Sequence, residues 1–299
     1  MAGKKHPILT VLGILAGIAL FLGTTMVVLL KLFSPSANLS FKDKIGVIPI
    51  EGPISDSQTI TSQLVKFKED KGIKAIILRI NSPGGAVGPT QEIHREVQKT
   101  VPTKKVIASI GGVAASGAYY VAAAADKIVA NPGTITGSIG VILRGNNLSK
   151  LLERVGIRFE TVKSGAFKDI LSPDRALSAE ERDLLQSLID SSYEQFVQAV
   201  AEGRQLEPDV VRRFADGRVF SGAQAKELGL VDALGDEESA RRKAAELAGL
   251  EADSQPVTLG KPRKQLMGLL PGSGLLWQLG QLLESEVLLA HQPLWLFRP

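Results

Sequence analysis

One serine in this chain of 299 residues is placed where a nucleophile could be presented. Ser116 follows the pair Gly111 and Gly112 and stands near the amino end of an apolar, alanine-rich stretch, residues 113–125, that predicts a buried helix. A hydroxyl in this position can attack a carbonyl carbon if a base removes its proton, or it can cap the helix. The spacing leaves both open, because Gly112 lies four residues before Ser116 and no Gly-x-Ser-x-Gly elbow is formed.

A base for such a serine would have to be a histidine or a lysine. His6 and His291 lie near the chain ends, and His94 lies between charged residues on a predicted solvated helix, so we interpret it as a surface histidine. A lysine can act when desolvation or nearby positive charge lowers its pKa and leaves a neutral amine. Lys168 follows a predicted strand and has small and apolar neighbours, but Asp169 could equally form an ordinary ion pair with it.

Glycine-rich turns could supply the rest of an acyl-transfer site. The turn at residues 81–85 directly follows a predicted strand, and the bare amides of Gly84 and Gly85 can turn toward a developing oxyanion. A second turn leads to the serine described above, and a third, residues 132–140, carries Ser138 between apolar segments. Taken singly, the first is also explained as a tight turn between a strand and a helix, and the third indicates little.

The elements that must position these residues alternate between apolar strands and amphipathic helices. This alternation predicts an α/β fold with a parallel sheet covered on both faces, whose ligand sites gather at the carboxyl ends of the strands, where the three turns fall. Strands are predicted over residues 45–50, 75–80, 106–110, 128–130, 139–143 and 159–162, and helices over 57–69, 87–99, 113–125, 179–202, 221–228 and 237–247.

The amino-terminal segment is predicted to be a membrane anchor. Residues 8–30 are uncharged and mostly aliphatic, which is long enough to span a bilayer. We favour a retained anchor over a cleaved signal, whose apolar core would be shorter and whose cleavage site would not place Pro35 at the −3 position. The lysines on the two sides are too evenly divided to choose an orientation.

The chain is therefore divided into a tail (1–7), an anchor (8–30), a linker (31–43), a folded domain (44–252) and a carboxyl-terminal tail (253–299). That last tail is amphipathic around Trp277. We expect it to pack against another subunit; lying on the membrane and occupying the protein's own groove are the alternatives.

Composition excludes several classes of function. A hydrophobic content of 44% is enough to form a sizeable core. The absence of cysteine from the sequence excludes disulfides, thiolate zinc sites and a cysteine nucleophile. The net charge of +4 is modest, and residues 261–264 are the only tight basic cluster, so we expect no nucleic-acid partner.

Together, the motifs resemble the signal peptide peptidase A family of serine peptidases, in its short single-domain form. The resemblance spans residues 44–247 and implies the Clp protease/crotonase-like fold, a repeated ββα/βα core, here preceded by one amino-terminal transmembrane helix. Its motifs are Asn81-Ser-Pro-Gly-Gly85, Ala114-Ala-Ser-Gly117 with Tyr119-Tyr120, Gly137-Ser-Ile-Gly-Val141 and Ser164-Gly-Ala-Phe-Lys-Asp169.

The resemblance implies a Ser-Lys dyad acting through an acyl-enzyme intermediate, with no metal or organic cofactor. Ser116 would be the nucleophile and Lys168 the general base. Ser138 would orient the lysine amine, and a methyl at Ala118, where the family often has glycine, could narrow the neighbouring pocket. The oxyanion donors would be Gly85 and Gly117, with Gly84 in support.

The resemblance also implies hydrophobic peptide substrates, namely signal peptides left in the membrane after cleavage. It implies a homo-oligomer in which Lys168 of one chain meets Ser116 of the next, and a catalytic domain on the extracytoplasmic side of the cell membrane, held in the lipid by a single span. Two other classes stay open: an acyl-thioester enzyme of the crotonase fold, and a non-catalytic membrane scaffold. The anchor and the presence of both dyad residues disfavour them.

Overall fold

A computed structural model describes residues 14–26, 43–251, 254, 256–259 and 294–296. The chain divides into two compact units, Met1–Lys42 and Asp43–Pro299. In the first unit, residues 14–26 form a helix with exposed aliphatic side chains. Within the described ranges, none of the helices is long and apolar enough to cross a membrane. Residues 8–13 and 27–30 of the predicted anchor lie outside those ranges, as does most of the carboxyl-terminal tail.

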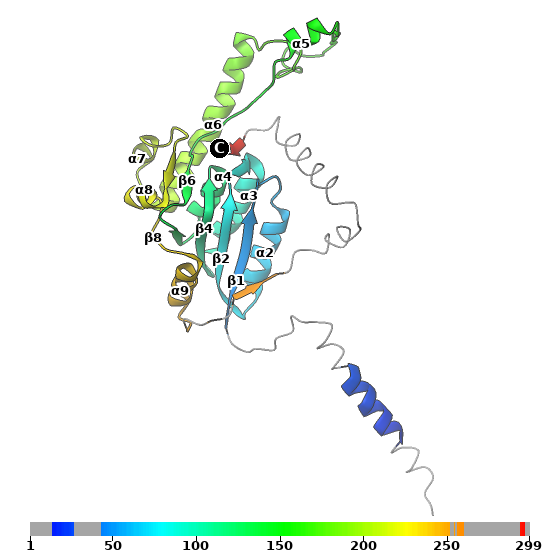
Figure 1. The fold of residues 1–299 in the computed structure, drawn as a ribbon, viewed down its shortest axis with the longest axis vertical. Helices are drawn as coiled ribbons and strands as arrows, with labels where there is room; N and C mark the ends of the chain where they lie inside the picture. The colour runs from blue at the N-terminus through cyan, green and yellow to red at the C-terminus, as the bar shows by residue number, and fades with distance from the viewer. Residues whose placement is uncertain (1–13, 27–42, 252–253, 255, 260–293, 297–299) are drawn as a thin grey trace, which may run out of the picture. The chain divides into compact units, whose positions relative to one another are not determined.

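The second unit is built on an eight-stranded sheet with the strand order β7-β6-β4-β2-β1-β9, to which β5 and β8 are added beside β4 (Figure 1). All of its neighbouring strands run parallel except β6 and β7. The strands are β1 (Lys44–Glu51), β2 (Ile73–Ser82), β4 (Lys105–Ala115), β5 (Lys127–Ala130), β6 (Ile135–Gly137), β7 (Val219–Ser221), β8 (Ala233–Leu234) and β9 (Pro256–Thr258).

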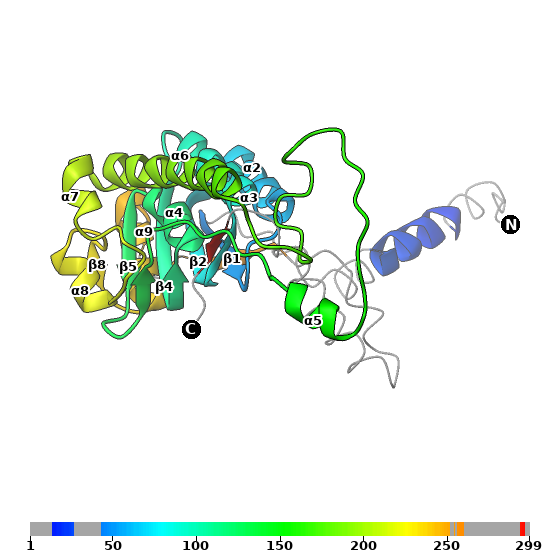
Figure 2. The same ribbon diagram turned by 90° about the horizontal axis from the view of Figure 1, so that it is seen from above.

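Helices cover both faces of this sheet, as the uninterrupted apolar strands predict. Alternate side chains of β1 and β2, such as Ile48 and Leu78, belong to the larger core cluster, and the intervening ones, such as Val47 and Ile77, pack with the helix on the other face. Figure 2 shows the helices of the larger cluster along one side of the sheet. They are α2 (Gln58–Glu69), α3 (Val87–Thr100), α4 (Gly117–Ala123) and α6 (Ala179–Arg204), and α7 (Pro208–Arg212) and α8 (Gly222–Glu227) also contribute buried residues to this cluster. Helix α9 (Glu237–Ala248) covers the opposite face, and α5 (Ser149–Arg154) has no buried residue.

A second, two-stranded sheet lies at the carboxyl ends of the central strands (Figure 1). It pairs β3 (Gly84–Ala86) with β10 (Leu294–Leu296) in antiparallel register, with Trp295 opposite Gly85. The last strand in the described ranges, β10, therefore runs beside the glycine turn that follows β2.

Most predicted elements are confirmed, and three are corrected. The helix expected over 113–125 is wrong at its start, because β4 continues to Ala115 and α4 begins at Gly117. The extension is possible because β4 pairs with β5 along its first part and with β6 along its last part. The strand expected over 139–143 lies earlier, as β6. Residues 159–162 form no strand and have exposed side chains, since no described strand lies beside them to pair with.

Residues 141–178, which we call the arm, leave the sheet after β6 and return to it through α6. In both views the arm projects beyond the sheet together with the first half of α6 (Figures 1 and 2). Apart from Glu181, the buried residues of α6 all fall in its second half, from Ser192 onward. The arm is therefore held at its base, and most of its surface is left exposed.

Candidate active site

Ser116 is the single residue between strand β4 and helix α4. Its backbone has φ 54° and ψ −123°, in a region that residues with a side chain rarely adopt. Its N–H donates to the carbonyl oxygen of Gly137 at 2.8 Å, and its own carbonyl accepts from the N–H of Tyr120 at 3.0 Å. These two bonds hold a sharp strand-to-helix turn of the kind that presents nucleophiles, although the sequence lacks the glycine spacing of an elbow.

The cap alternative is excluded by this geometry. Within the described part of the chain, the Ser116 side chain makes no capping hydrogen bond to α4, although the residue occupies the N-cap position. The residue is only 2% exposed. A buried hydroxyl that does not cap its helix, held in a strained conformation, is consistent with a functional rather than a structural serine.

The third turn lies directly beside Ser116. Gly137 pairs with Ala115 across β6 and β4, so the residues that follow each strand are neighbours. Gly137 (φ 81°) and Ser138 (φ 52°) both have positive φ, and the Ser138 N–H donates to the Arg218 carbonyl at 2.8 Å. A Cβ on Gly137 would lie 2.6 Å from the Phe220 ring. Glycine is therefore required where the turn brings Ser138 to the site.

The first turn lies on the other side of β4, where Ser82 at the end of β2 pairs with Ala114. Gly85 packs so closely against Ile54 that a Cβ would lie 2.0 Å from the Ile54 carbonyl oxygen. Backbone hydrogen bonds of 2.8 Å from Ile54 to Gly84 and from Ala86 to Ile54 hold the strand there. The Gly84 N–H donates to Ser82 Oγ at 3.2 Å. It is thus already engaged by a side chain.

The three turns predicted from the sequence converge at one edge of the sheet, but Lys168 does not join them. It lies in the arm with its side chain exposed, and its backbone N–H donates to the Gly165 carbonyl at 3.2 Å. In the described part of the chain, no hydrogen bond or ion pair joins Lys168 to Ser116 or Ser138. Figures 1 and 2 both show the arm extending away from the carboxyl ends of the strands. A single chain therefore presents the two dyad candidates apart.

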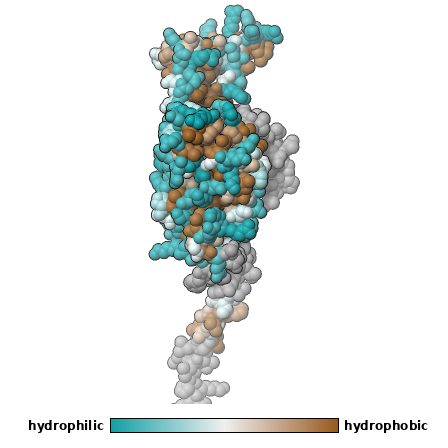
Figure 3. All heavy atoms as spheres, turned by 90° about the vertical axis from the view of Figure 1, so that its left-hand side faces the viewer, coloured by the Kyte–Doolittle hydropathy of each residue, from teal (hydrophilic) through white to brown (hydrophobic). Residues whose placement is uncertain are grey.

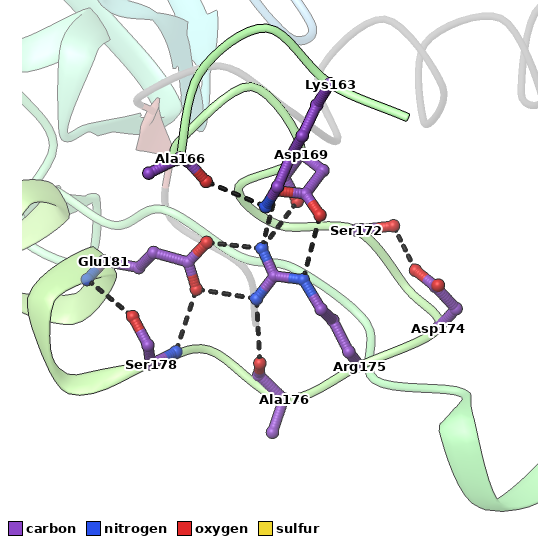
Figure 4. Close-up of polar contacts among 9 residues, drawn as sticks. All are labelled: Lys163, Ala166, Asp169, Ser172, Asp174, Arg175, Ala176, Ser178 and Glu181. Carbon is purple, nitrogen blue, oxygen red and sulfur yellow. Dashed lines mark hydrogen bonds and ion pairs between the residues drawn. The ribbon is translucent and has the colours of Figure 1, made fainter. Parts of the chain in front are cut away.

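The neighbouring carboxylate does not pair with Lys168. Asp169 accepts instead from Lys163 at 2.6 Å and from Arg175 at 2.8 Å (Figure 4). Sequence reasoning left this pairing open and missed Arg175. These residues lie in an irregular loop, where no helical or strand period relates them. Their contacts could therefore not be predicted from the sequence pattern.

The interpretation of His94 as a surface residue is wrong. It is 6% exposed, because α3 packs against α4, and its ring lies 4.4 Å from that of Tyr120. Burial, with a smaller contribution from Arg95, lowers the pKa of His94 to about 4. Its Nε2 has no hydrogen-bond partner among the described residues, so it does not form a triad with Ser116 there.

The described residues form no candidate metal site. No cluster of three or more histidine and carboxylate side chains among them could hold an ion. The polar groups at the convergent edge include hydroxyls, backbone amides and the Asn81 carboxamide, whose Oδ1 accepts from the Val113 N–H at 3.2 Å. Two threonine hydroxyls brace this edge, since Thr134 donates to the Gly111 carbonyl and Thr136 to the Ala114 carbonyl, both at 2.7 Å. The set suits acyl transfer.

Comparison with known proteins agrees with this chemistry. The sequence model of Peptidase family S49 matches residues 98–251, and that of Clp protease matches residues 39–134. The chain is 47% identical to the "Putative protease slr0021" of Synechocystis sp. over 270 residues, covering 87% of this chain and 98% of the relative.

Two further relatives are longer than the matched region. A "Putative signal peptide peptidase SppA" of Enterococcus faecium is 44% identical over 61% of this chain and 54% of its own length. "Protease 4" of Salmonella typhi is 39% identical over 69% of this chain and 35% of its own length. The chain belongs to peptidase family S49 and is a serine peptidase. Membership confirms the resemblance and disfavours the thioester-enzyme and scaffold alternatives.

Proposed function

We propose that this serine peptidase is a membrane-anchored endopeptidase that cleaves hydrophobic peptides, including remnant signal peptides, through a dyad of Ser116 and Lys168. The observation that carries the proposal is the conformation of Ser116. It is a buried serine with positive φ at a strand-to-helix junction, flanked on both sides by glycine turns. Strain of this kind is maintained where the surrounding structure over-determines it, and it clusters at active sites.

The reaction follows from the groups at this edge. The Lys168 amine takes the proton of the Ser116 hydroxyl as its oxygen attacks the peptide carbonyl, and the protonated amine then donates to the leaving nitrogen. Water next attacks the acyl-enzyme ester, again with the amine as base, and releases the acid. Ser138 orients the amine. No metal or organic cofactor takes part in these steps.

Backbone amides stabilise the oxyanion. Gly117 is the first residue of α4, so its N–H has no acceptor within the helix and is directed along the positive end of the helix dipole. Gly85 provides the second donor from the neighbouring turn. Gly84 has a supporting role, which requires its N–H to leave Ser82 Oγ. Each such donor is commonly worth about 3 kcal/mol of transition-state stabilisation.

A neighbouring copy of the chain supplies the lysine. Within one chain the arm holds Lys168 away from the serine, so the site is incomplete without a second copy. The arm also has unusually exposed apolar side chains, with Phe159 at 60% and Val162 at 101% of full exposure. Figure 3 shows hydrophobic residues at the upper end of the molecule, where the arm lies. Packing of the arm against another copy would bury these side chains and bring Lys168 to that copy's Ser116.

The substrate binds in an extended form along β3. The pairing of β10 with β3 indicates that this edge can accept an antiparallel strand next to the proposed oxyanion turn. Strand addition of this kind binds a peptide through its main chain and leaves side-chain preference to flanking pockets. The uncharged segment 8–30 holds the catalytic domain at the extracytoplasmic face of the cell membrane, close to signal peptides left in the lipid.

The test is hydrolysis of a fluorogenic hydrophobic peptide by the full chain in detergent. Ser116→Ala and Lys168→Ala should each assemble normally and fall to background. Mixing the two inactive variants under conditions that exchange subunits should restore a fraction of the activity, since some interfaces then combine an intact serine with an intact lysine. Full activity of Lys168→Ala would refute the dyad. Inactive mixtures with proven subunit exchange would refute the sharing of sites between copies.

A further inference from the structure

A compact ion cluster joins the arm to the start of α6 and includes Asp169, the residue that follows Lys168 in the chain (Figure 4). The Arg175 guanidinium donates two parallel hydrogen bonds to the Asp169 carboxylate, from Nη2 to Oδ1 at 2.8 Å and from Nε to Oδ2 at 3.1 Å. Lys163 Nζ donates to the same carboxylate at 2.6 Å and to the Ala166 carbonyl at 2.9 Å. A bidentate arginine pair fixes both distance and orientation, which a single lysine contact does not.

The other side of the guanidinium is held by the start of helix α6. Arg175 Nη1 donates to Glu181 Oε2 at 2.8 Å, and Nη2 bonds to the second oxygen of the same carboxylate. Glu181 is itself fixed by the capping box of α6, in which it accepts from the Ser178 N–H and donates its own N–H to Ser178 Oγ. Arg175 thus links the loop that contains Lys168 to the first turn of α6.

The charges of this cluster are balanced without Lys168. Lys163 and Arg175 are matched by Asp169 and Glu181, and the hydrogen bonds from Arg175 and Lys163 hold the pKa of Asp169 well below its usual range. The pKa of Glu181 is lowered to about 2, chiefly by Arg175. The remaining nearby carboxylate, Asp174, accepts from the Ser172 hydroxyl. Among the described residues, Asp169, Glu181 and Asp174 thus each accept hydrogen bonds from donors other than Lys168.

This occupancy matters for a lysine that must act as a base. A carboxylate paired with the amine would favour its charged form and raise its pKa, and a protonated amine cannot accept the serine proton. Asp169 is adjacent to Lys168 in the chain and would be the natural partner if its oxygens were free. The structure shows that Arg175 and Lys163 take those oxygens.

We propose that Arg175 is a positioning residue: it withholds the Asp169 carboxylate from Lys168 and fixes the loop, so that the lysine amine reaches the neighbouring active site unpaired. The inference rests on the proposed role of Lys168 as general base. It assigns Arg175 no contact with the substrate. Its effect is exerted through Lys168 alone.

The test is the pH dependence of kcat/KM for the fluorogenic peptide, measured with the full-chain enzyme. In the wild type, kcat/KM should rise with pH along an acidic limb that reports the general base of the site. Arg175→Met removes the donor of Asp169 Oδ2 and leaves the carboxylate with Lys163 alone, on Oδ1. It should move this acidic limb upward by about one pH unit, a tenfold loss of kcat/KM below the limb. Adding Asp169→Asn to Arg175→Met removes the carboxylate charge and should return the limb to within about 0.3 units of the wild type.

Controls separate this effect from simple damage to the arm. Arg212→Met removes a comparable pair of surface bonds, to Glu194 and Asp209 on α6 and α7, and should leave the limb unmoved. Arg175→Lys keeps the positive charge but not the bidentate geometry of the guanidinium, and should give a smaller upward shift of the limb than Arg175→Met. If Arg175→Met fails to assemble, the shift of the limb in Arg175→Lys tests the proposal instead.

An upward shift that is reversed in the double variant supports the proposal. A fall in activity without a shift of the limb, or a shift that persists in the double variant, overturns it. If Lys168→Ala remains active, the proposed function itself fails, and this outcome is distinct from an inactive Lys168→Ala combined with an unmoved limb in Arg175→Met.

Discussion

The backbone N–H of Ser116 donates to the carbonyl oxygen of Gly137 at 2.8 Å, across the boundary between strands β4 and β6. This bond joins two turns in which non-glycine residues, Ser116 and Ser138, both have positive φ. Because the two turns support each other, the position of the proposed nucleophile depends on a glycine more than twenty residues away in the sequence.

Gly137→Ala should therefore affect both stability and catalysis. The new Cβ would lie 2.6 Å from Phe220 at a residue with φ 81°, so both crowding and backbone strain oppose it. We expect a loss of about 1–3 kcal/mol in the free energy of unfolding and at least a tenfold fall in kcat. Urea denaturation and peptide hydrolysis measure the two. Gly133→Ala is the matched control, since nothing lies within 4 Å of its added methyl, and wild-type behaviour of Gly137→Ala would contradict the coupling.

Gly85→Ala should greatly reduce activity. Its Cβ would lie 2.0 Å from the Ile54 carbonyl oxygen, and backbone cannot rotate away as a side chain can, so β3 must shift. A shifted donor loses most of its oxyanion stabilisation, and we expect kcat to fall about 100-fold or more with the oligomer intact. Gly88→Ala, which has open space around its methyl on α3, serves as the control. Equal activity of the two variants would show that β3 does not provide a donor.

His94 should make the fold sensitive to acid. Its pKa is about 4 when folded and 6.5 in the unfolded chain, so the unfolded state takes up the proton first as the pH falls. The free energy of unfolding is therefore unaffected by His94 above about pH 6.5. It falls as the pH drops toward 4, by up to about 3 kcal/mol, because protonation then favours the unfolded chain. His94→Phe keeps a ring beside Tyr120 and cannot titrate. Urea unfolding at pH 7 and pH 4 should show a smaller difference for this variant; an equal difference would contradict the assignment.

The strand β10 should compete with peptide substrates. It lies antiparallel along β3, where we place the substrate main chain. Deleting residues 260–299 should lower KM by about two- to tenfold with kcat unchanged, because a tethered strand competes at a high effective concentration. Trp295→Pro, which removes one backbone donor from β10, should shift KM in the same direction. An unchanged KM in both variants would show that β10 and the substrate use different edges.

The sequence by itself determined the alternation of strands and helices and the three turns that converge at the site. These features depend on local periodicity and on glycine, whose conformational freedom is needed at Gly137 and whose small size is needed at Gly85. The patterns did not predict that Ser116 and Ser138 are neighbours, because the strand near Ser138 was expected at residues 139–143. It lies before Ser138, as β6, and its pairing of Gly137 with Ala115 brings the two serines together.

Only the tertiary structure decided which of the open alternatives hold. Ser116 does not cap α4, because β4 extends to Ala115 once β6 pairs with it and leaves the serine at a strained junction. His94 is buried because α4 packs against its helix, and Asp169 binds Arg175 because an irregular loop folds back on itself. Each outcome depends on contacts between segments that share no period in the sequence, and these contacts are set by the packing of the whole domain.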